Sequence, residues 1–173
     1  MPNFNKVGIY TKFHENDLLI SSSSLLVNSG SIIMPDRPAF SVYGSGTTSN
    51  LTTTQNGDGT LTTSNFTIEY NHGSHLNGST GVFTAPIAGL YQANLVARNS
   101  GYSSGISQIC ICKNNSNASG NLAMLEWASS STMNHVGVSK IYKLAVGDTL
   151  RIRVFAGQVN FDGNDSFSVA YIG

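Results

Sequence analysis

From residue 39 onward, apolar and polar positions alternate in short segments, the period of a β-strand with one buried face. Segment 90–98, for example, places four apolar side chains on a single face: Tyr91, Ala93, Leu95 and Ala97. Turn-forming residues separate such segments at intervals of about 8–12 residues, and we find no convincing amphipathic helix. The alternation predicts strands over 39–43, 65–70, 80–85, 90–98, 106–113, 122–127, 136–144, 149–156 and 166–172. We therefore expect an all-β sandwich or barrel.

Segment 106–113 differs from the others because it is apolar on both faces. One face carries Ile109 and Ile111, and the other carries Ile106, Cys110 and Cys112. A two-layer sandwich needs only one buried face per strand, and the chain has little insertion that could cover a second one. We therefore expect other copies of the chain to supply the cover, in an oligomer.

The two cysteines, Cys110 and Cys112, are separated by a single residue and fall on the same face of a strand. A disulfide across one residue would be strained, and no further residues of the type that bind metals are obvious nearby. We expect both to be buried free thiols that act as small apolar residues.

Residues 1–38 have a different pattern from the rest of the chain. They contain a run of four serines at 21–24, a turn signal at 28–30, and two prolines, Pro35 and Pro38, that favour an extended exit. This part is too short for a core of its own. We expect it to be an N-terminal arm or attachment adaptor, followed by a folded head over 39–173.

A turn formed by proline and glycine lies in the centre of the chain. Pro86 has no N–H to donate and therefore predicts a turn between two strands, while Gly89 can take a positive φ at a sharp re-entry. Phe83 and Tyr91 flank this turn and can bury against the same core. Together with two preceding positions, they form a spaced set: Asn71, Leu76, Phe83, Pro86, Gly89 and Tyr91.

This set, within "YNHGSHLNGSTGVFTAPIAGLY" (70–91), resembles the central block of the C1q-like globular domain, a member of the C1q/tumour-necrosis-factor superfamily. "VGVSKIYKLAVGDTLRIRV" (136–154) is similar to a later strand pair of that domain, and "PAFSVY" (38–43) to its first strand. The resemblance covers about residues 38–173. It implies a ten-stranded jelly-roll β-sandwich that forms a compact homotrimer and binds through loops and outer surfaces without catalysis.

Composition narrows the classes of partner. Apolar residues make up 40% of the 173-residue chain and charged residues only 10%, with a formal net charge of zero, whereas about 25% charged residues is typical. A neutral chain has no general attraction to nucleic acid or to an anionic membrane. The sequence shows no signal-peptide pattern and no apolar run of about 20 residues. We expect no nucleic-acid partner, no membrane insertion, and folding in a host cytoplasm.

Two loops contain residues that suit metal binding, each with a plainer alternative. His72 and His75 lie three residues apart, as a metal pair or as solvated loop residues. Asp162, Asn164 and Asp165 offer hard oxygen ligands for calcium, or form an Asx turn between two strands. Asn56 and Asp58 present the same choice. We expect no other cofactor, and we find no nucleophile and base arrangement that predicts an enzyme.

The functional hypothesis combines these points. The chain is expected to be a bacteriophage virion appendage, a head or tail fibre or spike, whose residues 1–38 attach to a virion or capsid protein. The head would bind a host-surface glycan or protein through its loops, with Tyr102, His72 and His75 as candidate ligand-loop residues. Trp127 is a further candidate contact, although it also suits the core. The alternatives are a capsid decoration or cement protein, and a secreted C1q-like recognition lectin. The expected location is the virion, or the extracellular space after release.

Overall fold

The structure is a computed structural model, and it describes residues 37–45, 50–52, 59–60, 66–99, 105–116, 118, 120–128 and 135–173. The described residues form strands and contain no helix, so none of them belongs to a helix long and apolar enough to span a membrane. The all-β prediction is confirmed. Residues 1–36, which include most of the predicted arm, lie outside the described residues, and the domain boundary at residue 38 stays a prediction.

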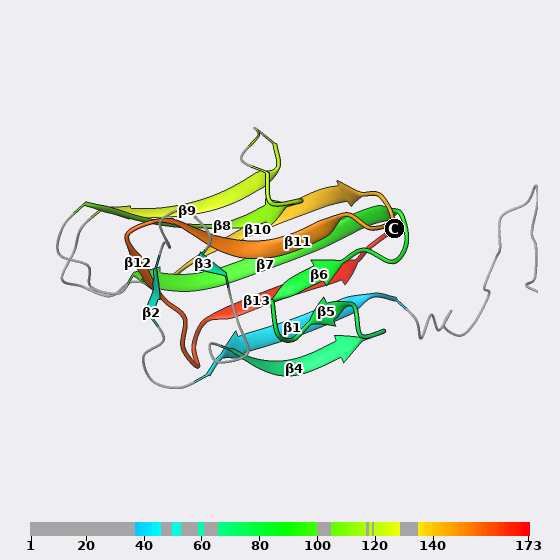
Figure 1. The fold of residues 1–173 in the computed structure, drawn as a ribbon, viewed down its shortest axis with the longest axis horizontal. Coiled ribbons are helices and arrows are strands. Elements are labelled where there is room, and N and C mark those ends of the chain that lie inside the picture. The colour runs from blue at the N-terminus through cyan, green and yellow to red at the C-terminus, as the bar shows by residue number, and fades with distance from the viewer. Residues whose placement is uncertain are drawn as a thin grey trace, which may run out of the picture. The chain divides into compact units, whose positions relative to one another are not determined.

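In the part of the chain that the structure describes, thirteen strands form two antiparallel sheets (Figure 1). The seven-stranded sheet has the order β2-β12-β7-β13-β1-β4, with β10 also paired to β7. Its strands are β1 (Ala39–Gly44), β2 (Asn50–Thr52), β4 (Phe66–His72), β7 (Gly89–Asn99), β10 (His135–Leu144), β12 (Gln158–Asn160) and β13 (Ser166–Tyr171). The six-stranded sheet has the order β5-β6-β11-β8-β9, with β3 also paired to β11. Its strands are β3 (Gly59–Thr60), β5 (Leu76–Asn77), β6 (Val82–Thr84), β8 (Ile106–Lys113), β9 (Leu122–Ala128) and β11 (Thr149–Ala156).

The sequence predicted every strand of six or more residues and the three-residue β6, and it missed four other short strands. Segments 106–113 and 149–156 match β8 and β11 residue for residue. The strands that it missed have two or three residues: β2, β3, β5 and β12. A strand of this length contains too few positions for an alternating pattern to be visible. These short strands also explain why the structure has more than the ten strands that the resemblance implied.

An unbroken series of aromatic rings runs through the core between the two sheets. Consecutive ring centroids lie 5.1–5.6 Å apart in the order Phe167, Phe40, Phe83, Tyr91 and Tyr171. The first four of these side chains are fully buried. They come from β13, β1, β6 and β7, so the series connects the two sheets. Such edge-to-face and tilted pairs stabilise a core beyond their buried area, by about 0.5–1.5 kcal/mol each.

The central strand β7 shows why the alternating pattern was informative. Tyr91, Ala93, Leu95 and Ala97 are fully buried, as the sequence predicted for one face of this segment. β10 pairs along one edge of β7, while β13 and β12 pair along the other. The even-numbered residues of β7 therefore face outward, on the side of the sheet away from the core.

The second apolar face of β8 is covered within the single chain, which corrects the expectation that another copy covers it. Cys110 and Cys112 are fully buried, on the face that they share with their register partners Arg153 and Arg151 of β11. The aliphatic stems of such arginines cover small side chains well, and Arg153 is itself buried. Ile106 is exposed. These thiols therefore give no argument for an oligomer.

Both cysteines are free and buried, as predicted. Burial, with a smaller contribution from neighbouring Cys112, raises the pKa of the Cys110 thiol to about 12. Since the thiolate is the nucleophile and the metal-binding form, a thiol that keeps its proton at neutral pH acts here as a small apolar residue.

Candidate functional site

Asn71 closes the tight turn between β4 and β5. Its side-chain Nδ2 donates to the carbonyl of Leu76 at 2.9 Å, and its Oδ1 accepts from the Leu76 N–H at 3.0 Å. Gly73 and Ser74 have φ values of +74° and +58°, so the backbone between the two residues reverses direction through left-handed conformations. The five-residue spacing that the sequence singled out is therefore a reciprocal pair of hydrogen bonds across this turn.

Replacing Asn71 by alanine is expected to lower the free energy of unfolding by about 1–3 kcal/mol, because two backbone groups of Leu76 lose their partners. Urea unfolding followed by circular dichroism measures the loss. Thr67→Ala, an exposed position on the same strand, is the control and should stay within about 0.5 kcal/mol of the unmodified protein. Equal stabilities for Asn71→Ala and the control would contradict this role.

Pro86 and Gly89 lie where the chain passes from β6 to β7, as the sequence predicted. The carbonyl of Ile87 accepts from the Tyr91 hydroxyl at 2.8 Å, which holds this loop against the core. A Cβ on Gly89 would come within 2.5 Å of Cε2 of Tyr171 and 2.6 Å of the carbonyl oxygen of Gly173, and the φ there is +156°. Gly89 is therefore required mainly by the close approach of the chain's last residues. In Figure 1 the C-terminus lies beside the connection from β6 to β7.

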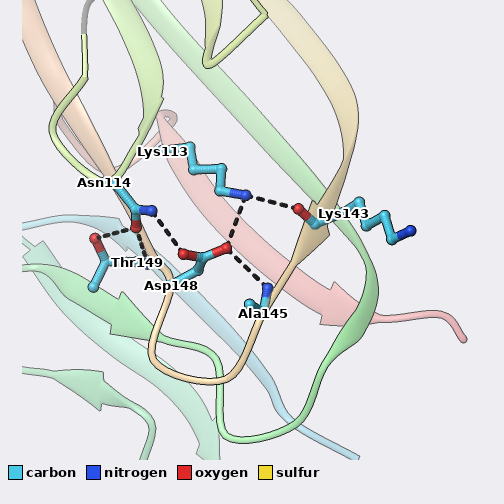
Figure 2. Close-up of polar contacts among 6 residues, drawn as sticks. All are labelled: Lys113, Asn114, Lys143, Ala145, Asp148 and Thr149. Atoms are coloured by element: carbon cyan, nitrogen blue, oxygen red, sulfur yellow. Dashed lines mark hydrogen bonds and ion pairs between the residues drawn. The ribbon is translucent and has the colours of Figure 1, made fainter.

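The turn between β10 and β11 is held by the carboxylate of Asp148 (Figure 2). Asp148 accepts from Lys113 Nζ at 2.8 Å, from Asn114 Nδ2 at 2.7 Å and from the Ala145 N–H at 2.8 Å. Asn114 in turn accepts from the Thr149 N–H at 2.7 Å. This network joins the β8–β9 turn to the β10–β11 turn, and it explains why the Gly147-Asp148 pair lies where the sequence placed a turn.

The Asp148 network predicts a loss of stability in acid. Hydrogen bonds from Lys113 and then Asn114 lower the pKa of Asp148 from 3.8 to about 2. The stabilisation is complete above pH 4 and is lost as pH falls through about 2. In this range the unfolded chain binds a proton at Asp148 more readily than the folded chain does, so acid favours unfolding. Urea titrations at pH 5, 3 and 2 should show a steeper loss for the unmodified protein than for Asp148→Asn. Parallel losses would contradict the prediction.

His72 and His75 lie at the two sides of the turn between β4 and β5. His72 is exposed at the end of β4, and His75 is partly buried, with its ring beside Gly73. No group of three or more His, Cys, Asp or Glu side chains among the described residues is placed to hold a metal ion. Trp127 packs in the core at 8% exposure, with its Nε1 lacking a hydrogen-bond partner. Tyr102, Asn56 and Asp58 lie outside the described residues.

Asp162, Asn164 and Asp165 form a closed turn between β12 and β13. The Asn164 N–H donates to Asp162 Oδ1 at 3.2 Å, and the Asp162 N–H donates to Asp165 Oδ2 at 2.8 Å. The Arg98 guanidinium pairs with Asp162 Oδ2, and His135 Nε2 lies 3.5 Å from Asp165 Oδ1. A cation from the protein therefore already neutralises Asp162, and the geometry favours the Asx turn over calcium binding.

The outward face of the seven-stranded sheet is uncharged across its centre. Within the described residues of β1, β7, β10 and β13, lysine, arginine and histidine side chains on this face occur only toward its ends, at Lys143, Arg98 and His135, and no aspartate or glutamate lies on it. The centre is polar and internally paired. Gln92 donates to Ser139 at 3.3 Å, and Asn94 donates to Ser168 at 3.4 Å.

Large apolar side chains are exposed around this polar centre. Ile141 on β10 is 56% exposed, opposite Gln92 of β7, and the others are Tyr43, Tyr70 and Leu90. An uncharged face with exposed aromatic and aliphatic side chains is suited to burial against another protein surface. Sequence reasoning missed these residues, although the period of two already puts Ile141 opposite the buried Tyr142 and Leu144.

The described residues have the jelly-roll fold seen in C1q and TNF domains. No protein-family model matches the chain, and no curated protein sequence matches it. The solved structures do. The globular domain of zebrafish complement 1qA is 22% identical, with a TM-score of 0.57 over 79% of this chain and 98% of that one.

Two further solved structures share the fold at lower identity. Eiger TNF from S. frugiperda is 13% identical, with a TM-score of 0.61 over 80% of this chain and 94% of that one. Murine APRIL, crystallised at pH 5.0, is 8% identical, with a TM-score of 0.56 over 79% of this chain and 99% of that one. The resemblance seen in the sequence is confirmed at the level of the fold.

Proposed function

We propose that this chain is a non-enzymatic, homotrimeric binding protein. The observation that carries the proposal is the outward face of the seven-stranded sheet, which is uncharged at its centre and exposes Ile141, Leu90, Tyr43 and Tyr70. Burial of apolar area drives most protein association. An interface between copies also needs a face on which no charged side chain is buried without a partner. Two further copies arranged around an axis would each cover part of this face.

We further propose that the trimer is a bacteriophage virion appendage, a fibre or spike, whose head binds a host-surface glycan or protein. The support comes from the sequence: a charge-poor surface rich in Ser, Thr, Asn and Gly, and a short N-terminal segment before the first strand. Three copies of a weak site would bind a repetitive cell surface tightly through avidity.

Deletion of residues 1–38 tests whether this segment attaches the protein to the particle while residues 39–173 bind the host. In this proposal the truncated protein no longer joins the particle but still binds host cells, as flow cytometry with labelled protein would show. Arg37 and Pro38 contact Tyr171 of β13, through a cation–π contact at 5.9 Å and a backbone hydrogen bond at 3.0 Å, so a second truncation at residue 36 keeps those contacts. A full-length protein that binds no host cell, and whose loss weakens the capsid, would instead indicate a decoration protein.

A further inference from the structure

A buried polar cluster lies on the outward side of the seven-stranded sheet, at the end of β7 opposite Gly89. Arg98 of β7 is the register partner of His135 on β10 and of Asn160 on β12, so it lies between them. The β12–β13 turn adds Asp162 and Asp165 to this group. The proposed interface does not explain the cluster, because charged groups of this kind are costly to bury.

When both aspartates are ionised and His135 is neutral, the cluster has one more negative charge than positive charges. Asp165 is fully buried and Asp162 is 5% exposed. Arg98 pairs directly with Asp162, whereas Asp165 Oδ1 has no hydrogen-bond partner. His135 Nε2, at 3.5 Å from that oxygen, forms an ion pair with it only while protonated. With neutral His135, two buried carboxylates therefore share the single guanidinium charge of Arg98.

Among the described residues, three charged or titratable neighbours of Asp165 come from three parts of the fold. β7 supplies Arg98, β10 supplies His135, and its own turn supplies Asp162. β1 supplies a backbone group, the Gly44 N–H, which donates to the carbonyl oxygen of Asp165 at 3.1 Å, and it places the phenol Tyr43 in register with Ser166, the residue after Asp165. No further charge from these elements compensates the buried carboxylate.

We propose that this cluster is a proton-binding lock, in which uptake of one proton by the buried Asp165 carboxyl tightens the β12–β13 turn against β7 and β10. Burial raises the pKa of Asp165 to about 6, from 3.8, although the positive charges of His135 and Arg98 act in the opposite direction. The folded chain therefore holds a proton between about pH 4 and pH 6 that the unfolded chain does not. The stabilisation is complete below pH 4 and is lost as pH rises through about 6.

The lock acts next to two segments of the chain, 100–104 and 129–134. Arg98 is the penultimate residue of β7, which ends where segment 100–104 begins, and His135 is the first residue of β10, directly after segment 129–134. Segment 100–104 contains Tyr102, the loop aromatic that the sequence singled out. A change in the anchoring of Arg98 and His135 therefore reaches the bases of both segments. The inference does not depend on trimer formation.

Urea unfolding of the full-length protein between pH 4.5 and pH 8, at one fixed protein concentration, tests the lock. The folding equilibrium constant should fall as pH rises, by at most about 100-fold, since the pKa difference is about 2 units. In Asp165→Asn this fall should disappear, because the amide keeps an oxygen for the Asp162 N–H and carries no charge. A fall of the same size in Asp165→Asn overturns the proposal.

Two further variants sharpen the assignment. His135→Gln should move the transition to higher pH, because protonated His135 favours the ionised carboxylate. A transition that vanishes in His135→Gln but persists in Asp165→Asn would assign the proton to the histidine and overturn the proposal. Asp148→Asn is the matched control: its carboxylate titrates near pH 2, so the fall between pH 4.5 and pH 8 should be unchanged.

A direct measurement covers the case in which Asp165→Asn does not fold. NMR titration of the Asp165 carboxyl carbon in the unmodified protein should give a midpoint near pH 6. A midpoint near 3.8, the ordinary value for this group, would contradict the lock.

Discussion

Replacing Ile141 by glutamate is expected to turn the proposed trimer into monomers at micromolar concentration. Ile141 is 56% exposed on the outward face of β10, in register with Gln92 of β7. In the proposed trimer, each copy would then bury the new carboxylate. The β7 residue opposite it, Gln92, carries no charge that could pair with it. A buried unpaired charge costs several kcal/mol, and three copies carry it at once. Sedimentation equilibrium measures the mass of the variant.

The control for Ile141→Glu is Val146→Glu. Val146 is more exposed, at 67%, but it lies in the β10–β11 turn and not on the sheet face. This variant should remain trimeric. Circular dichroism must show that both variants keep the strand signal of the unmodified protein. A folded Ile141→Glu protein that stays trimeric would show that the interface lies elsewhere.

Replacing Phe83 by alanine is expected to lower the free energy of unfolding by about 3–5 kcal/mol. Phe83 is fully buried, and its ring lies 5.5 Å from that of Phe40 and 5.6 Å from that of Tyr91. Its loss leaves a cavity in the middle of the aromatic series, where the six-stranded sheet contacts the seven-stranded one. Urea unfolding at matched protein concentration measures the effect.

Thr84→Ala is the control for Phe83→Ala, since Thr84 is the exposed next residue on β6. It should change stability by less than about 0.5 kcal/mol. Phe83→Leu keeps most of the volume and should fall between the two. A loss below about 1 kcal/mol in Phe83→Ala would mean that the rings around it do not form a single core.

The sequence predicted much of the fold because several of its long strands alternate between apolar and polar positions. In β7, each residue that the period of two placed on one face is buried, from Tyr91 to Ala97. The spacing from Asn71 to Tyr91 added the fold class, since these residues form a hydrogen-bonded turn and two members of the aromatic series. Local pattern and tertiary packing agree in this part of the chain.

The sequence did not predict the functional surface, because the period of two tells the faces of a strand apart but not what covers them. It led us to expect a second copy over Cys110 and Cys112, where Arg151 and Arg153 of the same chain lie on the same face. The exposed Ile141, in the other sheet, was missed. The sequence also did not predict the polar cluster. Arg98 and Asp165 are 67 positions apart, and only sheet register brings them together.

The mass of the unmodified protein in solution tests the central claim, that the outward face of the seven-stranded sheet is an interface between three copies. Sedimentation equilibrium or native mass spectrometry should give about three times the 18.3 kDa chain mass at micromolar concentration. A folded species of 18.3 kDa, stable and soluble at that concentration, would contradict it.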